Sequence, residues 1–184
     1  MSAFPAELTG TWEIDASHST VGFAAKHAVV ATTRGSFTSF TGGATIDAAA
    51  PETSSAWLDI DVASITTGNE QRDGHLKSPD FFDVENHPQI TFRSTSARLD
   101  GDELVTTGDL TINGKSVPVD VVWEFGGIAQ DPWGNTKAGF EGKATISRKD
   151  WGLTWNAALE TGGVLISDKI KLVLEIEAGK KADA

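Results

Sequence analysis

The sequence predicts an all-β fold: a closed antiparallel barrel of about eight strands with a short helix near one mouth. Three observations predict it. Apolar and polar residues alternate over long stretches, turn signals separate these stretches, and one segment lacks the alternation. Alternation with one polar face is typical of antiparallel strands that bury one side. Closure is expected because long adjacent strands would otherwise leave unpaired edges.

The alternation is clearest at residues 117–125, 138–146 and 170–176, where apolar or small residues occupy every second position. Tight hairpins are expected at Leu99–Leu104 and at Ile112–Ser116, since Asp-Gly and Asn-Gly are strong hairpin signals. The expected strands are residues 11–15, 19–28, 33–47, 55–66, 88–99, 103–113, 115–128, 136–148 and 168–178.

Two places depart from simple alternation. Phe37 and Phe40 differ in parity, so a bulge is expected in the strand at 33–47. Residues 69–76 contain good helix formers and no alternation, which predicts a short helix capped by Asn69. Pro79 follows shortly after, as is common beyond a helix end.

Composition limits the function classes. The chain has 184 residues, 39% of them hydrophobic, a formal net charge of -11 and no cysteine. We expect one domain, residues 1–184 with its core at 11–178. The acidic charge argues against a nucleic-acid partner, and disulfide or thiolate chemistry is excluded. The sequence shows no secretory signal and no membrane-spanning run, so a soluble cytoplasmic protein is expected.

The histidines and carboxylates of the chain raise two alternatives, metal binding and catalysis. Among His18, His27, His75 and His87, no pair has the i, i+4 spacing of a helical zinc site. Distant strands could still bring histidines and carboxylates together, but a histidine hydrogen-bonded at a strand end is commoner, so no metal is expected. A hydrolase could use Asp73, His75 and Ser78, yet the G-x-S-x-G motif is missing. These three residues are expected to organise the helix corner by hydrogen bonds.

The inward-facing positions indicate where a ligand would lie. Small residues at 25, 108, 142 and 144 interleave with large ones, which favours a cavity, although the same pattern would help a packed barrel to taper. His27 shares the parity of Phe23, so it either contacts a ligand or is a buried, hydrogen-bonded histidine. The expected ligand-binding residues are Phe23, His27, Phe37, Phe92, Leu110, Trp123, Phe140 and Leu172.

Five motifs occur in a specific order: HSTVGFAAKH (18–27), RGSFTSFTGG (34–43), SITTGNEQRDGHLKSPDFFDVENHPQITFRST (64–95), GDLTINGKSVPV (108–119) and ISRKDWGL (146–153). Together they resemble the YceI-like family over nearly the whole chain, from about Trp12 to about Glu177. The part RDGHLKSPDFFDV is the most distinctive.

The resemblance implies an extended, lipocalin-like barrel with an elongated apolar tunnel. Family members bind long-chain amphiphiles there, notably polyisoprenoids and in some cases prenylated quinones or fatty-acid-like molecules. No catalytic activity is established for them. Many members are periplasmic and carry a signal peptide, a pattern from which this chain departs. A homodimer would be unsurprising for the family.

We therefore expect non-catalytic binding, carriage or storage of a long-chain apolar lipid of the polyisoprenoid or prenylated quinone type, with no other cofactor. The alternative is an enzyme that uses histidines and carboxylates at the barrel mouth on a hydrophobic substrate. Leu76, Phe81 and Phe82 are expected to pack the helix over the barrel, with Phe92 on the tunnel wall.

Overall fold

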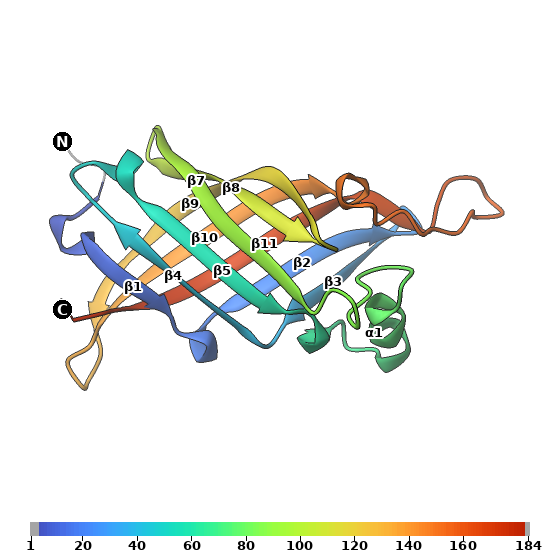
Figure 1. Ribbon diagram of the computed structural model, residues 1–184, viewed down its shortest axis with the longest axis horizontal. Helices are drawn as coiled ribbons and strands as arrows, with labels where there is room; N and C mark the ends of the chain where they lie inside the picture. Colours follow the sequence, from blue (N-terminus) through green and yellow to red (C-terminus); the bar gives the residue numbers. More distant parts are fainter. Residues whose placement is uncertain (1–3, 183–184) are drawn as a thin grey trace.

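Eight antiparallel strands form a closed ring in the computed structural model, which describes residues 4–182 (Figure 1). The ring closes where Trp12 pairs with Lys180. Its strands, in spatial order, are β1 (Gly10–Ile14), β4 (Phe40–Ile46), β5 (Ser55–Asp61), β7 (Gln89–Asp100), β8 (Glu103–Ile112), β9 (Lys115–Gln130), β10 (Thr136–Ser147) and β11 (Ile166–Lys180). The expected all-β barrel is confirmed.

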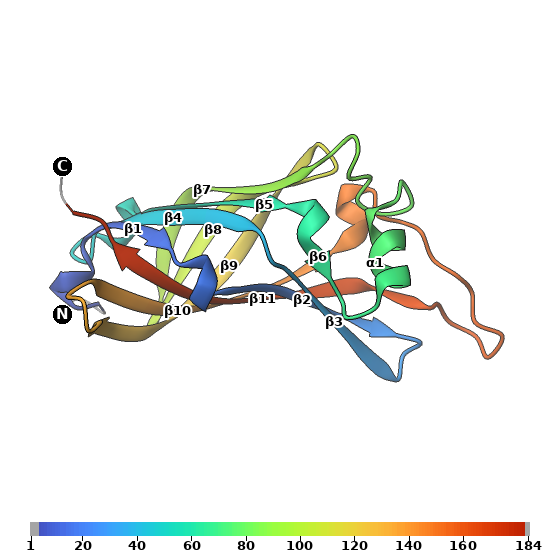
Figure 2. The ribbon, with the colours of Figure 1, turned by 90° about the horizontal axis from the view of Figure 1, so that it is seen from below.

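Three further strands extend the sheet beyond the ring: β2 (Thr20–His27), β3 (Ala31–Phe37) and β6 (Ile65–Thr66). β2 pairs with the same strand, β11, as β1 does. β3 directly precedes β4 in the chain, and β6 follows β5. β3 pairs with β6, just as β4 pairs with β5. The barrel is therefore closed at the end that holds β1 and splayed between β6 and β7 at the other end, which we call the wide mouth (Figures 1 and 2).

The expected single strands at 33–47 and 55–66 are wrong in one respect, because each is split. The first breaks at Thr38 and Ser39, and the second at the 3-10 helix η4 (Val62–Ser64). Ser64 ties the two breaks together, since its Oγ accepts hydrogen bonds from both backbone amides at 38 and 39. Because the strand breaks between them, Phe37 and Phe40 both point to the buried face although they differ in parity. The break lies where a bulge was expected.

The short helix is α1 (Glu70–Lys77), beside the wide mouth (Figure 2). The Asn69 side chain accepts a hydrogen bond from the Arg72 amide at 2.9 Å, which confirms the expected cap. Phe81 is buried, and Leu76 and Phe82 pack against the core, so the helix corner covers the barrel as expected.

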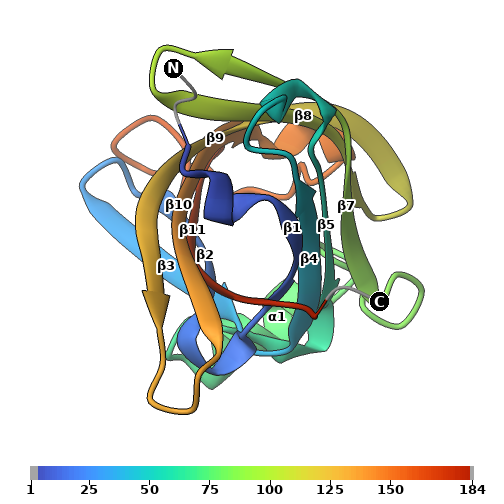
Figure 3. The same cartoon turned by 90° about the vertical axis from the view of Figure 1, so that its left-hand side faces the viewer.

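Short 3-10 helices lie at the ends and corners of the barrel: η1 (Ala6–Leu8), η2 (Ala16–His18), η3 (Pro51–Thr53) and η5 (Arg148–Trp151). At the closed end, η1 lies across the ring opening (Figure 3). Leu8 is almost completely buried there, and its carbonyl accepts a hydrogen bond from the Trp12 indole at 2.8 Å. Phe4 packs edge-on against Phe125. Apolar side chains of η1 and its neighbours therefore pack at this end of the barrel.

Among the helices of residues 4–182, none has both the length and the apolar character that crossing a bilayer would require.

Candidate functional site

One apolar cavity of about 410 Å³ runs inside the barrel. Every strand of the ring contributes side chains to its wall. On β11 the lining extends from Ile166 to Ala178, which corresponds to about 40 Å of strand at about 3.3 Å per residue. The cavity is therefore elongated along the barrel, and its volume lies in the range of pockets that hold small molecules, about 300–1,000 Å³.

All eight residues that the sequence singles out as ligand contacts lie on this wall. The structure brings them together from seven strands, although they are far apart in the chain: Phe23, His27, Phe37, Phe92, Leu110, Trp123, Phe140 and Leu172. His27 is exposed at the end of β2 and lines the cavity there. The alternative in which it is a buried histidine is therefore wrong. Contact of the eight residues with a ligand remains a prediction.

Three aromatic rings on the wall lie over glycines of a neighbouring strand. Phe23 covers Gly35, and Phe92 covers Gly108. Trp123 covers Gly142, where a Cβ atom would lie 2.5 Å from the indole ring. The Trp123 indole also donates a hydrogen bond to Thr106 at 2.9 Å, which holds the ring in place. Because each glycine leaves room for a ring against the wall, these rings do not fill the interior.

Aromatic contacts join α1 to the chain after η5 at the wide mouth. The ring of Trp155 meets the ring of His75 edge-on at 4.6 Å and that of Phe81 at 5.4 Å. His75 Nε2 lies 2.9 Å from Asp80 Oδ2. Sequence reasoning missed Trp155, which lies outside the alternating segments. In the sequence, the only feature that points to Trp155 is the pair of tryptophans in the stretch DWGLTW.

The trio considered for hydrolysis has other partners. The Ser78 hydroxyl donates to the His75 carbonyl at 2.6 Å, and Asp73 accepts from the amide and hydroxyl of Thr67. With the His75–Asp80 contact, these bonds tie α1 to its flanking loops. The expectation that the three residues organise this corner is confirmed.

Arg148, which sequence reasoning also missed, is a buried charge on the cavity wall. Its Nε donates to Ser167 O at 3.1 Å, and its Nη1 donates to the carbonyls of Leu153 and Trp155, both at 2.8 Å. Nη2 is buried without a hydrogen bond, 3.7 Å from Asp168 Oδ1. Burial lowers the pKa of this guanidinium, and the Asp168 carboxylate opposes the shift. Arg148 thus holds the segment after η5 against β11.

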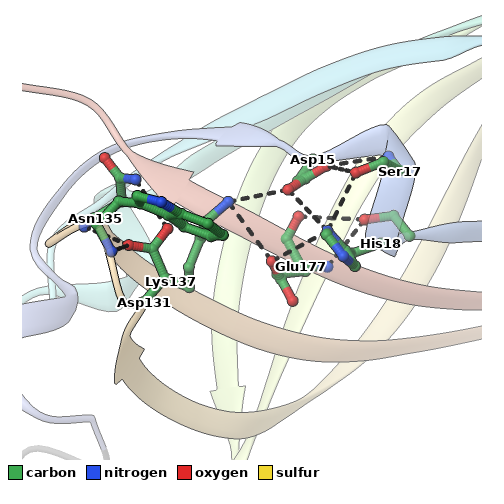
Figure 4. Close-up of polar contacts among 9 residues, drawn as sticks. Asp15, Ser17, His18, Asp131, Asn135, Lys137 and Glu177 are labelled. Atoms are coloured by element: carbon green, nitrogen blue, oxygen red, sulfur yellow. Dashed lines mark hydrogen bonds and ion pairs between the residues drawn. The ribbon is translucent and has the colours of Figure 1, made fainter.

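A polar cluster on the outside of the barrel gathers Asp15, His18, Lys137 and Glu177 (Figure 4). In the described chain, the three acid and imidazole groups are the one set whose ligand atoms approach closely enough to hold a metal ion. However, Lys137 Nζ already lies 3.0 Å from Asp15 and 3.6 Å from Glu177. The ammonium group supplies the positive charge that these carboxylates require, so the cluster is an ion-pair network. It ties the break between β1 and β2 to β10 and β11.

This network should make stability depend on pH. Hydrogen bonding to Asp15, with the charge of Glu177, raises the pKa of His18 above its usual 6.5. Because the folded state binds this proton more tightly, the stabilisation is fully present below the unfolded pKa and is lost as pH rises through the folded value. The wild type should therefore melt above a His18→Gln variant in weak acid, and the gap should close in mildly alkaline buffer. A gap that does not change with pH would contradict this prediction.

A closed antiparallel barrel around one elongated apolar cavity defines this chain as a lipocalin-like barrel protein. Residues 12–178 match the family model of the YceI-like domain. The chain belongs to the YceI-like family, which confirms the resemblance seen in the sequence.

Individual relatives agree with this assignment. Protein YceI of Escherichia coli O157:H7 is 36% identical over 163 residues, covering 89% of this chain and 82% of that protein. The crystal structure of BcnA from Burkholderia cenocepacia has a TM-score of 0.76 and 27% identity, and the match covers 89% of this chain and 98% of that one. A polyisoprenoid binding domain from Saccharophagus degradans matches with a TM-score of 0.67 and 16% identity, covering 92% and 98%. At that identity the likeness concerns the fold.

Proposed function

We propose that the protein binds one long-chain lipid of the polyisoprenoid or prenylated quinone type along the cavity, and carries or stores it without covalent chemistry. The observation that carries this proposal is the elongated apolar wall, which follows β11 for about 40 Å. The eight wall residues from Phe23 to Leu172 would contact the chain of the lipid. A flexible hydrocarbon chain fits such a wall because it requires shape and length and few polar partners.

Membership of the YceI-like family supports lipid binding. The Saccharophagus degradans domain, described as polyisoprenoid binding, shares the fold and so agrees with a chain-like ligand. The polar residues at the wide mouth also favour binding over catalysis, since Ser78 donates to a backbone carbonyl and Asp73 accepts from Thr67.

Affinity should rise with the length of the lipid chain. Each methylene group moved from water into an apolar site contributes about 0.8 kcal/mol, so one more isoprene unit should tighten binding at least about tenfold until the cavity is full. Displacement of a fluorescent apolar probe by farnesol, geranylgeraniol and solanesol would test this, because the three alcohols share one head group. Equal affinity for all three would argue against a tunnel that binds the chain.

A further inference from the structure

The closed end of the cavity is formed by the chain just before the first strand of the ring. Phe4 and Leu8 of this segment line the cavity, and so does Trp12 of β1. The exposed fractions of the three residues are only 6%, 1% and 2%. These side chains therefore have almost no contact with solvent, and η1 lies across the ring opening beside them (Figure 3).

The other end of the cavity reaches solvent. His27 and Arg72 line the cavity at the wide mouth, and both residues are exposed. The barrel is also splayed there, between β6 and β7. A long apolar chain would therefore enter at the wide mouth, and its far end would come to rest against Phe4, Leu8 and Trp12.

The backbone of η1 is fastened to two strands of the ring. The Trp12 indole on β1 donates a hydrogen bond to the Leu8 carbonyl at 2.8 Å. Lys180 on β11 donates from Nζ to the Glu7 carbonyl at 2.7 Å, and the same ammonium group lies 5.6 Å from the centre of the Trp12 ring. Trp12 and Lys180 are paired where the ring closes, so η1 is held beside the line of closure.

Two further contacts attach the segment to other parts of the ring. Thr9 Oγ1 accepts a hydrogen bond at 2.9 Å from the amide of Ala48, in the loop after β4. Phe4 meets Phe125 of β9 edge-on at 5.9 Å. Gly10 allows the chain to turn from η1 into β1, because its φ of 141° is one that residues with a side chain rarely adopt. The segment therefore cannot swing aside without losing contacts to several parts of the barrel.

We infer that η1 is a floor that sets the longest chain the cavity accepts, and that Leu8 is its main specificity-determining residue. This inference rests on the proposed function and specifies the length class of the lipid. Apolar walls distinguish chains by shape and length. Affinity grows with each methylene group that enters the cavity, and it stops growing once the chain meets a surface that does not move. Isoprene units beyond that length would remain in water at the wide mouth.

A series of prenyl alcohols that differ only in chain length tests the floor. The series runs from geraniol to solanesol in steps of one isoprene unit, and each alcohol displaces a fluorescent apolar probe. In the wild type, the gain of at least about tenfold per isoprene unit should end at one alcohol, which we call the limit. Alcohols longer than the limit should bind no more tightly than the limit itself.

Two substitutions at the closed end should move the limit in opposite directions. Leu8→Ala shortens a side chain of the floor, so the first alcohol beyond the wild-type limit should bind this variant about tenfold more tightly than the wild type. Ala44→Leu enlarges a side chain of the cavity wall beside Trp12, with which Ala44 pairs, and should move the limit to a shorter alcohol. Ala44→Leu leaves η1 unaltered, so it provides the test if Leu8→Ala does not fold.

Val62→Ala is the matched control. Like Leu8, Val62 is only 1% exposed, but it lies in η4 and does not line the cavity. The substitution should lower stability as core truncations do, while the limit remains that of the wild type. Chemical unfolding of all three variants shows which of them are folded under the conditions of the titration.

The outcomes separate the two proposals. The inference about the floor is wrong, and the proposed function stands, if affinity for the wild type rises through the whole series. The same holds if either folded variant of the closed end keeps the wild-type limit, or if Val62→Ala moves the limit as far as Leu8→Ala does. If none of the alcohols binds, the proposed function itself fails.

Discussion

Gly142→Val should cost the protein most of its affinity for a long-chain lipid. A Cβ atom at this position would lie 2.5 Å from the Trp123 ring, which cannot remain against the wall. The ring would turn into the cavity and give up its hydrogen bond to Thr106. We expect at least about a tenfold loss in affinity for geranylgeraniol, together with a stability cost of about 1–3 kcal/mol from overpacking.

Gly139→Val is the matched control on the same strand. A Cβ atom at Gly139 meets nothing within 4 Å, so this variant should bind the lipid as the wild type does. Titration of both variants with one prenyl alcohol, alongside chemical unfolding, separates a blocked cavity from a damaged fold. Wild-type affinity in Gly142→Val would contradict the position of the ring and the path of the ligand.

Arg148→Leu should lower the free energy of unfolding by about 3–5 kcal/mol. The substitution removes three hydrogen bonds and leaves the carbonyls of Leu153, Trp155 and Ser167 without their donor. The segment 153–165 should then become sensitive to proteases. Chemical unfolding and limited proteolysis would measure the two effects.

Arg148→Lys keeps the charge but cannot reproduce the fork of N–H donors, so it should recover only part of the lost stability. Full recovery would mean that charge alone matters at this position. An unchanged stability of Arg148→Leu would contradict the role of the arginine as the tie between η5, β11 and the following segment.

Local patterns predicted most of the barrel. The strand expected at 103–113 is observed as β8, Glu103–Ile112, because alternation and the flanking Gly-containing turns are local properties. The N-cap of α1 was also predicted, since Asn69 acts on its own helix end. The splits at 38–39 and 62–64 could not be predicted with their cause, because they depend on Ser64 meeting a strand about 25 residues away.

The cavity wall was predictable for a related reason. In a closed barrel, parity decides which side chains point inward, so the residues at alternating positions, such as Trp123 and Leu172, lie on the wall. The contacts of Arg148 and Trp155 at the wide mouth were not predictable, because Arg148 is the last residue of the strand expected at 136–148 and Trp155 lies beyond it. Arg148 contacts β11, and Trp155 contacts α1. These contacts join residues that are far apart in the sequence, so local sequence patterns do not predict them.

Native mass spectrometry of the purified protein, followed by extraction and identification of any released molecule, tests the central claim most directly. The account predicts one long-chain lipid, prenyl in type, at close to one molecule per chain. If the purified protein is empty, it should take up a prenyl ligand when the two are incubated together. A protein that is empty and still takes up no prenyl or fatty-acid ligand would contradict the account.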